Sequence, residues 1–130
     1  MGGGESKVAY KAWFGMSDCV FCKIAQKEIP STVVYEDEQV VAFRDLQPQA
    51  PEHVLVIQKK HVESVLGLQQ EDKDLAAHIL VDVLPEIAKQ LGVDASGFRL
   101  VVNTGKDGQQ TVKHLHFHLL GGRSMQWPPG

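Results

Sequence analysis

The sequence predicts an α+β fold in which five antiparallel strands form one sheet, with a short N-terminal helix and one long helix packed against it. Two observations support this prediction. The apolar pattern changes along the chain from a short helical segment to three strands, a long helical segment and two further strands. The 130 residues, 43% of them hydrophobic, are enough for one domain with a sizeable core.

The N-terminal residues 1–17 contain three consecutive glycines and no clear period, so we expect a flexible tail before a folded domain over residues 18–130. At the start of that domain, Asp18 is expected to cap a short helix through residues 21–25. Ile29-Pro30 is expected to end this helix, because the residue before a proline disfavours the helical conformation.

Three strand-like segments follow the short helix. The acidic run Glu36-Asp37-Glu38 lies between the first two and suits a hairpin turn, while a loop over residues 44–51 leads to the third. The predicted strands are residues 33–35, 39–43 and 53–58.

A long helix is predicted between residues 70 and 91, where apolar residues recur at helical spacing and should face a sheet. Pro85 is expected to bend the helix, because proline removes a backbone hydrogen bond, and Gly92 is expected to end it. The apolar stripe consists of Leu75, Ile79, Val83 and Ile87, widened by Leu80, Leu84 and Leu91. The two last strands are predicted over residues 98–103 and 112–120.

Composition and charge narrow the classes of partner. A formal net charge of -3 gives no reason to expect a general polyanion binder, so no nucleic acid partner is predicted and a nucleotide would need a local site. No segment is long and apolar enough to cross a bilayer. Gly2 and Ser6 match a myristoylation pattern, but a single acyl chain binds membranes weakly. Two cysteines are too few for a disulfide scaffold, so we expect a reducing compartment, the cytoplasm or the nucleus.

Three histidines alternate with apolar residues in the last predicted strand. His114, His116 and His118 therefore share one face, with same-face neighbours about 7 Å apart. A neutral imidazole is a nucleophile near pH 7 and its protonated form is a donor, so one ring can attack phosphorus while another donates a proton. Catalysis, metal ligation and a solvated polar face all remain open from the residues alone.

Cys19 and Cys22 form a second group of chemically active side chains. Two thiolates at the start of a helix bind zinc when two more soft ligands converge on them. The alternative is a pair of reduced cysteines that pack as small apolar residues.

The run from His114 to Leu120 matches the signature of the histidine triad nucleotide-binding superfamily, in which three histidines alternate with apolar residues. Over roughly residues 18–130 the chain resembles the Hint branch of that superfamily. The similar segments are Phe21-Cys22-Lys23-Ile24, Glu28-Ile29-Pro30, Pro48-Gln49-Ala50-Pro51, His53-Val54-Leu55-Val56-Ile57, Asn103, Gly121-Gly122-Arg123 and the ending Trp127-Pro128-Pro129-Gly130.

The resemblance implies a homodimeric purine nucleoside phosphoramidase whose sheet extends across the dimer. Such proteins act on adenosine or guanosine phosphoramidates, with nucleotidyl-lysine and aminoacyl adenylates among their substrates, and need no cofactor for catalysis. By motif position His116 is the nucleophile that forms a nucleotidyl-histidine intermediate, which water later hydrolyses. His118 would contact the phosphate, His53 would join a proton relay, and His114 would support the backbone around the site.

The resemblance also implies where the nucleotide binds. Asp45 would accept hydrogen bonds from the ribose, and Trp127 would reach the site of the dimer partner. The residues that would flank the base are Phe21, Ile29, Phe43 and Leu46, although simple core packing is an alternative for each of them. Those that would hold the phosphate and leaving group are Asn103, Gln110 and Thr111.

Some members of the superfamily bind structural zinc through a cysteine pair, the histidine after the third strand and the first histidine of the triad. The corresponding residues are Cys19, Cys22, His61 and His114, so the resemblance implies a structural zinc site.

Two other functions remain open. Thr111 stands where many Hint proteins have serine, and Gln110-Thr111-Val112-Lys113 is similar to the dinucleoside polyphosphate hydrolases. The chain could therefore be a dinucleoside polyphosphate hydrolase or a nucleotidyltransferase, although the Trp127-Pro128-Pro129-Gly130 ending favours the phosphoramidase. A third alternative is a zinc-stabilised nucleotide-binding interaction module.

Overall fold

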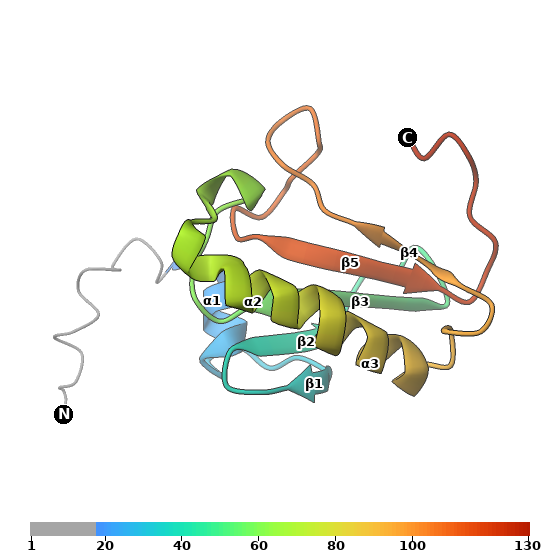
Figure 1. The fold of residues 1–130 in the computed structure, drawn as a ribbon, viewed down its shortest axis with the longest axis horizontal. Coiled ribbons are helices and arrows are strands. Elements are labelled where there is room, and N and C mark those ends of the chain that lie inside the picture. Colours follow the sequence, from blue (N-terminus) through green and yellow to red (C-terminus); the bar gives the residue numbers. More distant parts are fainter. Residues whose placement is uncertain (1–17) are drawn as a thin grey trace, which may run out of the picture.

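A computed structural model describes residues 18–130, so the predicted flexible tail and the myristoylation pattern at Gly2 lie outside the described residues. The described chain forms one antiparallel sheet with the strand order β1-β2-β3-β5-β4 (Figure 1). The strands are β1 Val33–Glu36, β2 Val40–Arg44, β3 Glu52–Gln58, β4 Phe98–Val101 and β5 His116–Gly121. The predicted α+β fold with five antiparallel strands is confirmed.

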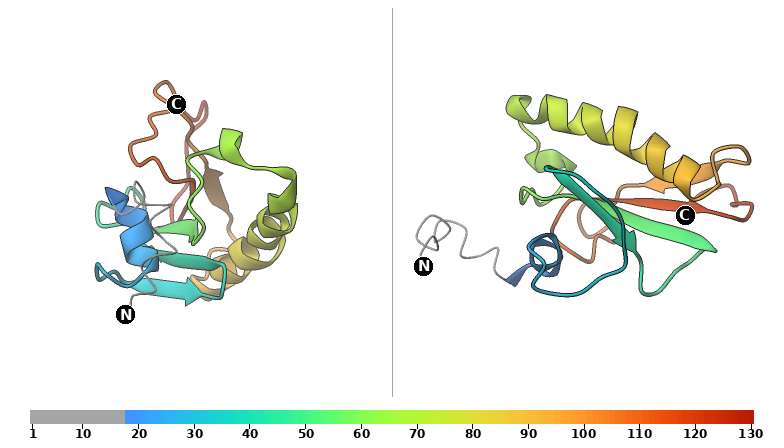
Figure 2. Two further views of the ribbon diagram at one scale, coloured as in Figure 1. Left: turned by 90° about the vertical axis from the view of Figure 1, so that its left-hand side faces the viewer. Right: turned by 90° about the horizontal axis from the view of Figure 1, so that it is seen from below.

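The two faces of the sheet are covered by different helices. The long helix, which contains α2 Lys73–Ala77 and α3 Leu84–Gln90, lies across one face, while the short helix α1 Val20–Ala25 lies on the other (Figure 2). Within residues 18–130, no helix combines the length and the apolar character needed to span a membrane.

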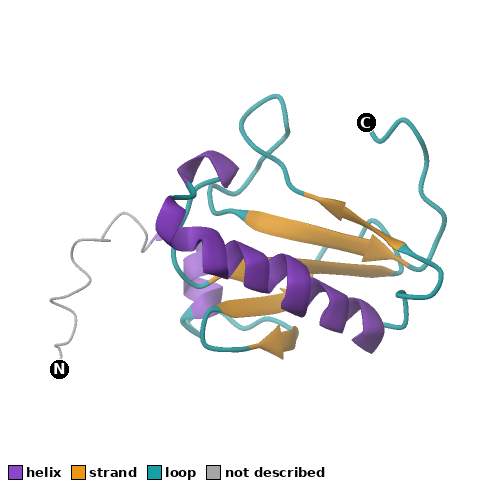
Figure 3. Ribbon diagram, in the orientation of Figure 1, coloured by secondary structure: helices purple, strands orange, loops and turns teal. Residues whose placement is uncertain are grey.

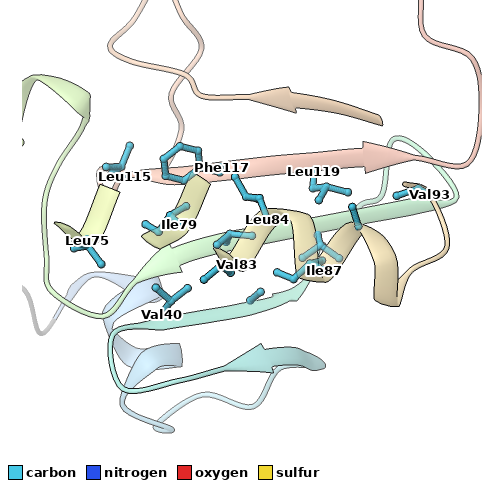
Figure 4. Packing of buried hydrophobic residues seen from close by; sticks show 14 residues of the cluster. Val40, Leu75, Ile79, Val83, Leu84, Ile87, Val93, Leu115, Phe117 and Leu119 are labelled. Carbon is cyan, nitrogen blue, oxygen red and sulfur yellow. The ribbon is translucent and has the colours of Figure 1, made fainter. Parts of the chain in front are cut away.

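The main core lies between the long helix and the sheet (Figure 4). Ile79, Val83 and Ile87 point from the helix onto the inner residues of the central strands, where Phe117 and Leu119 of β5 meet them. These side chains are almost completely removed from water, and burial of this kind contributes roughly 1.5–3 kcal/mol per large apolar residue. Because side chains alternate across a strand, His116 and His118 of β5 point to the opposite face of the sheet from Phe117 and Leu119.

A second, smaller core lies on the face that carries these histidines. Phe21 and Ile24 of α1 pack there against apolar residues of β2 and β3. The strand residues of this cluster are Val41, Phe43, Leu55 and Ile57. Because α1 has only six residues, it depends on these contacts for its stability.

The long helical segment is not uniform. It opens with the 3-10 turn Gln70–Asp72 and becomes π-helical over His78–Val83, just before Pro85. A π-helical turn is a common way to accommodate an interruption of the α-helical hydrogen bonds, so the effect of Pro85 takes this form. Gly92, with φ of 74°, follows the last turn as predicted. A separate 3-10 turn, Val65–Gly67, lies earlier in the chain.

Several local predictions are wrong. Cys19 rather than Asp18 is the N-cap of α1, because its sulfur accepts the hydrogen of the Cys22 backbone N–H. The helix ends at Ala25 instead of continuing to Ile29-Pro30, since Lys27 already has a φ of 66°. The strand expected to end at residue 103 stops at Val101. Leu80, expected to widen the apolar stripe, is 52% exposed, since it comes one residue after the buried Ile79 and so points about a quarter turn away from it.

The last strand also begins later than predicted, at His116 rather than at residue 112. Residues 112–115 belong to the long connection from β4 (Figure 3). Leu115 donates its backbone hydrogen to Val62, which lies beyond the end of β3, so this segment is held outside the ladder. His114 is consequently not a strand residue, and its side chain has different surroundings from those of His116 and His118.

Candidate active site

The central strands bring three histidines together on the α1 face of the sheet. His116 and His118 of β5 lie opposite Ile57 and Leu55 of β3, and His53 belongs to the same face of β3. The ring centroids of His116 and His118 are 5.0 Å apart, and those of His53 and His118 are 5.2 Å apart.

His116 has the geometry of a nucleophile. Its Nδ1 lies 2.6 Å from the carbonyl oxygen of His114, and because a carbonyl only accepts, Nδ1 carries the hydrogen. The lone pair is then on Nε2, which has no hydrogen-bond partner among residues 18–130. Burial lowers the pKa of His116, so the ring is neutral and nucleophilic near pH 7.

His53 and His118 form a hydrogen-bond chain with a defined direction. The backbone N–H of Gln49 donates to His53 Nδ1 at 3.0 Å, which places the hydrogen of His53 on Nε2. His53 Nε2 donates in turn to His118 Nδ1 at 3.0 Å. His118 is therefore left with its hydrogen on Nε2, available to a ligand.

Burial keeps the two rings of this chain neutral. It lowers the pKa of His53, and together with the neighbouring His116 and His53 it lowers the pKa of His118 to about 4. The Asp45 carboxylate lies 3.5 Å from His53 Nε2 and partly opposes the shift. At pH 7 His118 consequently acts as a neutral N–H donor and His116 as a neutral nucleophile.

A cavity of about 430 Å³ opens in front of His116 and His118, a size suited to a small organic ligand. Phe21 forms one wall and packs edge-on against the rings of His116 and Phe43, with centroid distances of 5.0 and 5.6 Å. The sequence-predicted residues that line the cavity are Phe21, Ile29, Phe43, Asp45, Leu46, Thr111, His116 and His118.

Several of the lining residues were not predicted from the sequence, although the spacing of two of them along the chain would have indicated their position. Ile24 follows Phe21 by three residues on the same side of α1, and Leu55 follows His53 by two residues on the same face of β3. The other lining residues are Val20, Pro30, Ser31, Arg44, Gln47 and Val112.

Three predicted nucleotide-binding residues do not line this cavity. Asn103 is half-buried just after β4. Gln110 has its side chain bonded to three backbone groups: it donates to the oxygens of Glu63 and Val112 and accepts from the N–H of Gly105. Trp127 is 81% exposed, so its predicted contact with a partner's site stays a prediction.

A second cluster lies beside the cavity and combines two thiols with two imidazoles. The Nδ1 atom of His114 is 3.4 Å from Cys19 Sγ and 3.5 Å from Cys22 Sγ, and His61 Nδ1 is 3.2 Å from Cys22 Sγ. His114 Nε2 donates to the backbone oxygen of Gln58 at 2.8 Å, so its Nδ1 lone pair faces the sulfurs.

This cluster fits a structural zinc ion. All four potential ligand atoms lie within 4.8 Å of one another, and two sulfurs with two imidazole nitrogens are a common donor set for zinc. Zinc bonds of about 2.0–2.3 Å in a tetrahedron separate its ligands by roughly 3.3–3.8 Å, close to the distances found here. Burial lowers the pKa of His114 to about 4, which keeps this ring available as a neutral ligand.

The chain is similar to known proteins over most of its length. Residues 26–125 match the HIT domain family. An uncharacterized HIT-like protein of Synechococcus elongatus is 51% identical over 113 residues, which are 87% of this chain and 97% of that protein.

Solved structures show the same similarity. A HIT family hydrolase from Legionella pneumophila superposes with a TM-score of 0.84 and 50% identity, covering 87% of this chain and 100% of that one. A histidine triad protein from Clostridium difficile has a TM-score of 0.80 and 52% identity, covering 84% of this chain and 94% of the other.

Proposed function

The chain belongs to the HIT domain family and resembles its hydrolases, and from this premise we propose that it hydrolyses purine nucleoside phosphoramidates through a nucleotidyl-His116 intermediate. The observation that carries the proposal is the free Nε2 of a neutral His116 at the wall of an apolar cavity. A solvated polar face, one of the alternatives left open by the sequence, does not fit a His116 that is only 5% exposed.

In the first step, Nε2 of His116 attacks phosphorus and the bond from phosphorus to the amine nitrogen breaks. The amine nitrogen takes up one proton from solvent as its bond to phosphorus breaks, and His116 becomes a cationic nucleotidyl-imidazole that keeps its hydrogen on Nδ1. The carbonyl oxygen of His114 stabilises this charge because it accepts that hydrogen at 2.6 Å. His118 donates from Nε2 to the phosphate as negative charge develops there.

In the second step, water attacks the same phosphorus and the bond to Nε2 of His116 breaks. The water leaves its hydroxyl on phosphorus and gives its other proton to solvent, the nucleoside monophosphate is released, and His116 returns to its neutral form with the hydrogen on Nδ1. The hydrogen-bond chain from the Gln49 backbone through His53 holds His118 in one tautomer throughout, so no reorientation of the donor is needed between the steps.

The shape of the cavity supports a nucleoside as the fixed part of the substrate. A flat purine base would lie among Phe21, Ile29 and Phe43, and Asp45, which lines the same cavity, would accept hydrogen bonds from the ribose hydroxyls. Thr111 supplies a hydroxyl near the histidines at the same cavity. The resemblance also assigns Asn103 and Gln110 to the phosphate and leaving group, but neither lines this cavity, so that contact stays a prediction.

Trapping the intermediate tests this function. An adenosine phosphoramidate is mixed with the protein and the reaction is stopped in denaturant within one turnover. Mass spectrometry should find the nucleotidyl group on His116, with an equimolar release of amine. A diadenosine polyphosphate is assayed in parallel, and faster turnover of this compound would favour the P–O–P hydrolase instead. Turnover without any adduct would contradict the covalent route.

We also propose that Cys19, Cys22, His61 and His114 bind one structural zinc ion. Bound zinc would hold α1 against the sheet and contribute folding energy rather than take part in the reaction. Metal analysis of protein purified without chelators should give about one zinc per chain, and less than about a tenth would contradict the proposal. We also propose a cytoplasmic or nuclear location, where thiols of this kind stay reduced.

A homodimer is the assembly we propose. Strand β4 lies at the edge of the sheet, where its backbone has no second neighbour within residues 18–130, and its Phe98 and Leu100 are 37% and 39% exposed. Pairing of this edge with β4 of a second copy would extend the sheet and satisfy its hydrogen bonds. Light scattering that finds only monomers at micromolar concentration would contradict the dimer and the role assigned to Trp127.

A further inference from the structure

His114 belongs to both the thiol–imidazole cluster and the immediate surroundings of the nucleophile. We propose that zinc in this cluster positions His116, so that metal occupancy determines the orientation of the nucleophile and not only the stability of the fold. The inference rests on the proposed function for its relevance to catalysis. It concerns His114 and Phe21 as positioning residues that act through His116.

The first link is the two-sided role of His114. Its ring is fully buried and is fixed from both ends, by the oxygen of Gln58 at 2.8 Å and by the sulfurs of Cys19 and Cys22 at 3.4 and 3.5 Å. Its backbone oxygen accepts the Nδ1 hydrogen of His116 at 2.6 Å. The position of that oxygen therefore depends on how firmly the His114 ring is held.

The backbone around His114 makes this dependence stronger. Residues 112–115 lie outside the ladder of β5, and in the described chain their backbone is tied to the rest of the molecule by few bonds. Leu115 donates to Val62, and the Gln110 side chain donates to the oxygen of Val112. The ring of His114 is consequently a main anchor of the peptide whose oxygen sets the tautomer of His116.

The second link runs through α1. Phe21 lies between Cys19 and Cys22 in the sequence, and its ring packs edge-on against the rings of His116 and His114, with centroid distances of 5.0 and 6.0 Å. The same ring lines the nucleotide cavity. A metal ion bound to Cys19 and Cys22 would therefore restrain Phe21, which is both a wall of the cavity and a neighbour of His116.

The chemistry of the cluster explains why a metal would matter. Thiols are weak hydrogen-bond donors, and a contact of 3.4 or 3.5 Å to an imidazole restrains a ring only loosely. Four bonds to one zinc ion would replace these contacts and fix Cys19, Cys22, His61 and His114 relative to one another. A displacement of about 1 Å at a reacting group can lower a rate about 100-fold, so a small loss of restraint at His114 is expected to be visible at His116.

His61 allows the idea to be tested without changing any group that contacts His116. The full chain is compared as wild type, His61→Ala and His61→Cys, each labelled with ¹⁵N in histidine. Zinc content, the imidazole ¹⁵N spectrum of His116 and kcat for an adenosine phosphoramidate are measured, with a thermal melt to establish that each protein is folded. His61→Cys keeps a donor set that zinc accepts and is the matched control.

We expect zinc-loaded wild type and His61→Cys to show His116 as a single tautomer with hydrogen on Nδ1. His61→Ala should lose zinc, show averaged His116 nitrogen shifts while still folded, and lose kcat by about 10- to 100-fold. A folded, zinc-free His61→Ala with the wild-type His116 spectrum would overturn the proposal. Loss of the whole fold on zinc removal, in His61→Ala and in chelated wild type alike, would also overturn it, because zinc would then be a general structural element.

The two proposals fail in different ways. If zinc-loaded wild type does not cleave the phosphoramidate, the proposed function is wrong, yet the His116 spectrum still reports on the metal. If the phosphoramidate is cleaved and the His116 spectrum does not respond to zinc, only the coupling is wrong.

Discussion

The Nε2 atom of His53 lies 3.0 Å from the Nδ1 atom of His118, and the backbone N–H of Gln49 gives this hydrogen bond its direction. Because Gln49 occupies Nδ1 of His53, the hydrogen of His53 must be on Nε2 and point to His118. The tautomer of the His118 ring, which faces the cavity, is thus set through His53 by a main-chain group of Gln49.

Replacement of His53 by alanine should therefore impair catalysis more than binding. His118 would lose the donor that holds its hydrogen on Nε2, and we expect kcat to fall about 100-fold with a small change in the dissociation constant of AMP. Steady-state kinetics and calorimetric titration measure the two quantities. His78→Asn, which changes a histidine remote from the cavity, is the control and should keep the wild-type kcat. An equal loss in kcat and in AMP affinity would contradict a role in orienting His118.

Asp45→Asn should weaken the binding of nucleotides that carry ribose hydroxyls. A hydrogen bond to a charged acceptor is worth about 1.5–3 kcal/mol, so AMP affinity should fall roughly 10- to 100-fold. Dideoxy-AMP has no hydroxyl for the carboxylate, and its affinity should be similar in both proteins. Competition binding of the two nucleotides to wild type and variant separates these cases. A comparable loss for dideoxy-AMP would place the effect elsewhere in the cavity.

Acid should destabilise the protein partly through His118. Its pKa is about 4 in the folded state and near 6.5 when unfolded, so the unfolded chain takes up this proton first as the pH falls. The stability contributed by the buried neutral ring is complete above about pH 6.5 and is lost progressively toward pH 4.

Urea denaturation at pH 7 and pH 4.5 measures this contribution. Wild type should lose on the order of 2 kcal/mol more than His118→Asn between these pH values, because the variant has no proton to take up at this site. The same loss in both proteins would mean that His118 does not carry the effect.

His78 should have the opposite pH dependence. Its ring bridges Asp82 at 2.9 Å and Asp37 at 2.6 Å, and these carboxylates raise its pKa, Asp82 having the larger effect. The stability from this bridge is present in full below the unfolded pKa of about 6.5 and is lost as the pH rises through the folded pKa.

His78→Asn should therefore lower the free energy of unfolding by about 1 kcal/mol at pH 6, and by clearly less at pH 9. Asp82→Asn removes one of the two partners and should give a smaller loss with the same pH trend. A loss in His78→Asn that is equal at both pH values would show that its packing, rather than its charge, stabilises the helix.

Periodic features of the fold could be predicted from the sequence. The alternation in β5 places His116 and His118 on one face and Phe117 and Leu119 on the other, because successive side chains of a strand point to opposite faces of the sheet. The position of His114 could not be found this way. It depends on the bond from Leu115 to Val62, which joins residues far apart in the chain.

The site likewise has residues that could be predicted from the sequence and residues that could not. Half of the cavity-lining side chains were identified from motif positions, most of them large apolar or titratable residues. Gln49 was not assigned a role because it acts through its backbone N–H, a group that nearly every residue has. The cap of α1 is a similar case, since Asp18 and Cys19 are adjacent and both side chains can accept a hydrogen bond.

The strict alternation of β5 has a consequence for how this protein can change over evolutionary time. Phe117 and Leu119 face the long helix, whereas His116 and His118 face the cavity, whose other walls come from α1, β2 and the loops that follow them rather than from the main core. Substitutions that alter the choice of substrate and substitutions that alter the folding free energy therefore fall on different sides of one sheet. A lineage could diversify its ligands at Ile29 or Leu46 while the opposite side maintains a stable scaffold.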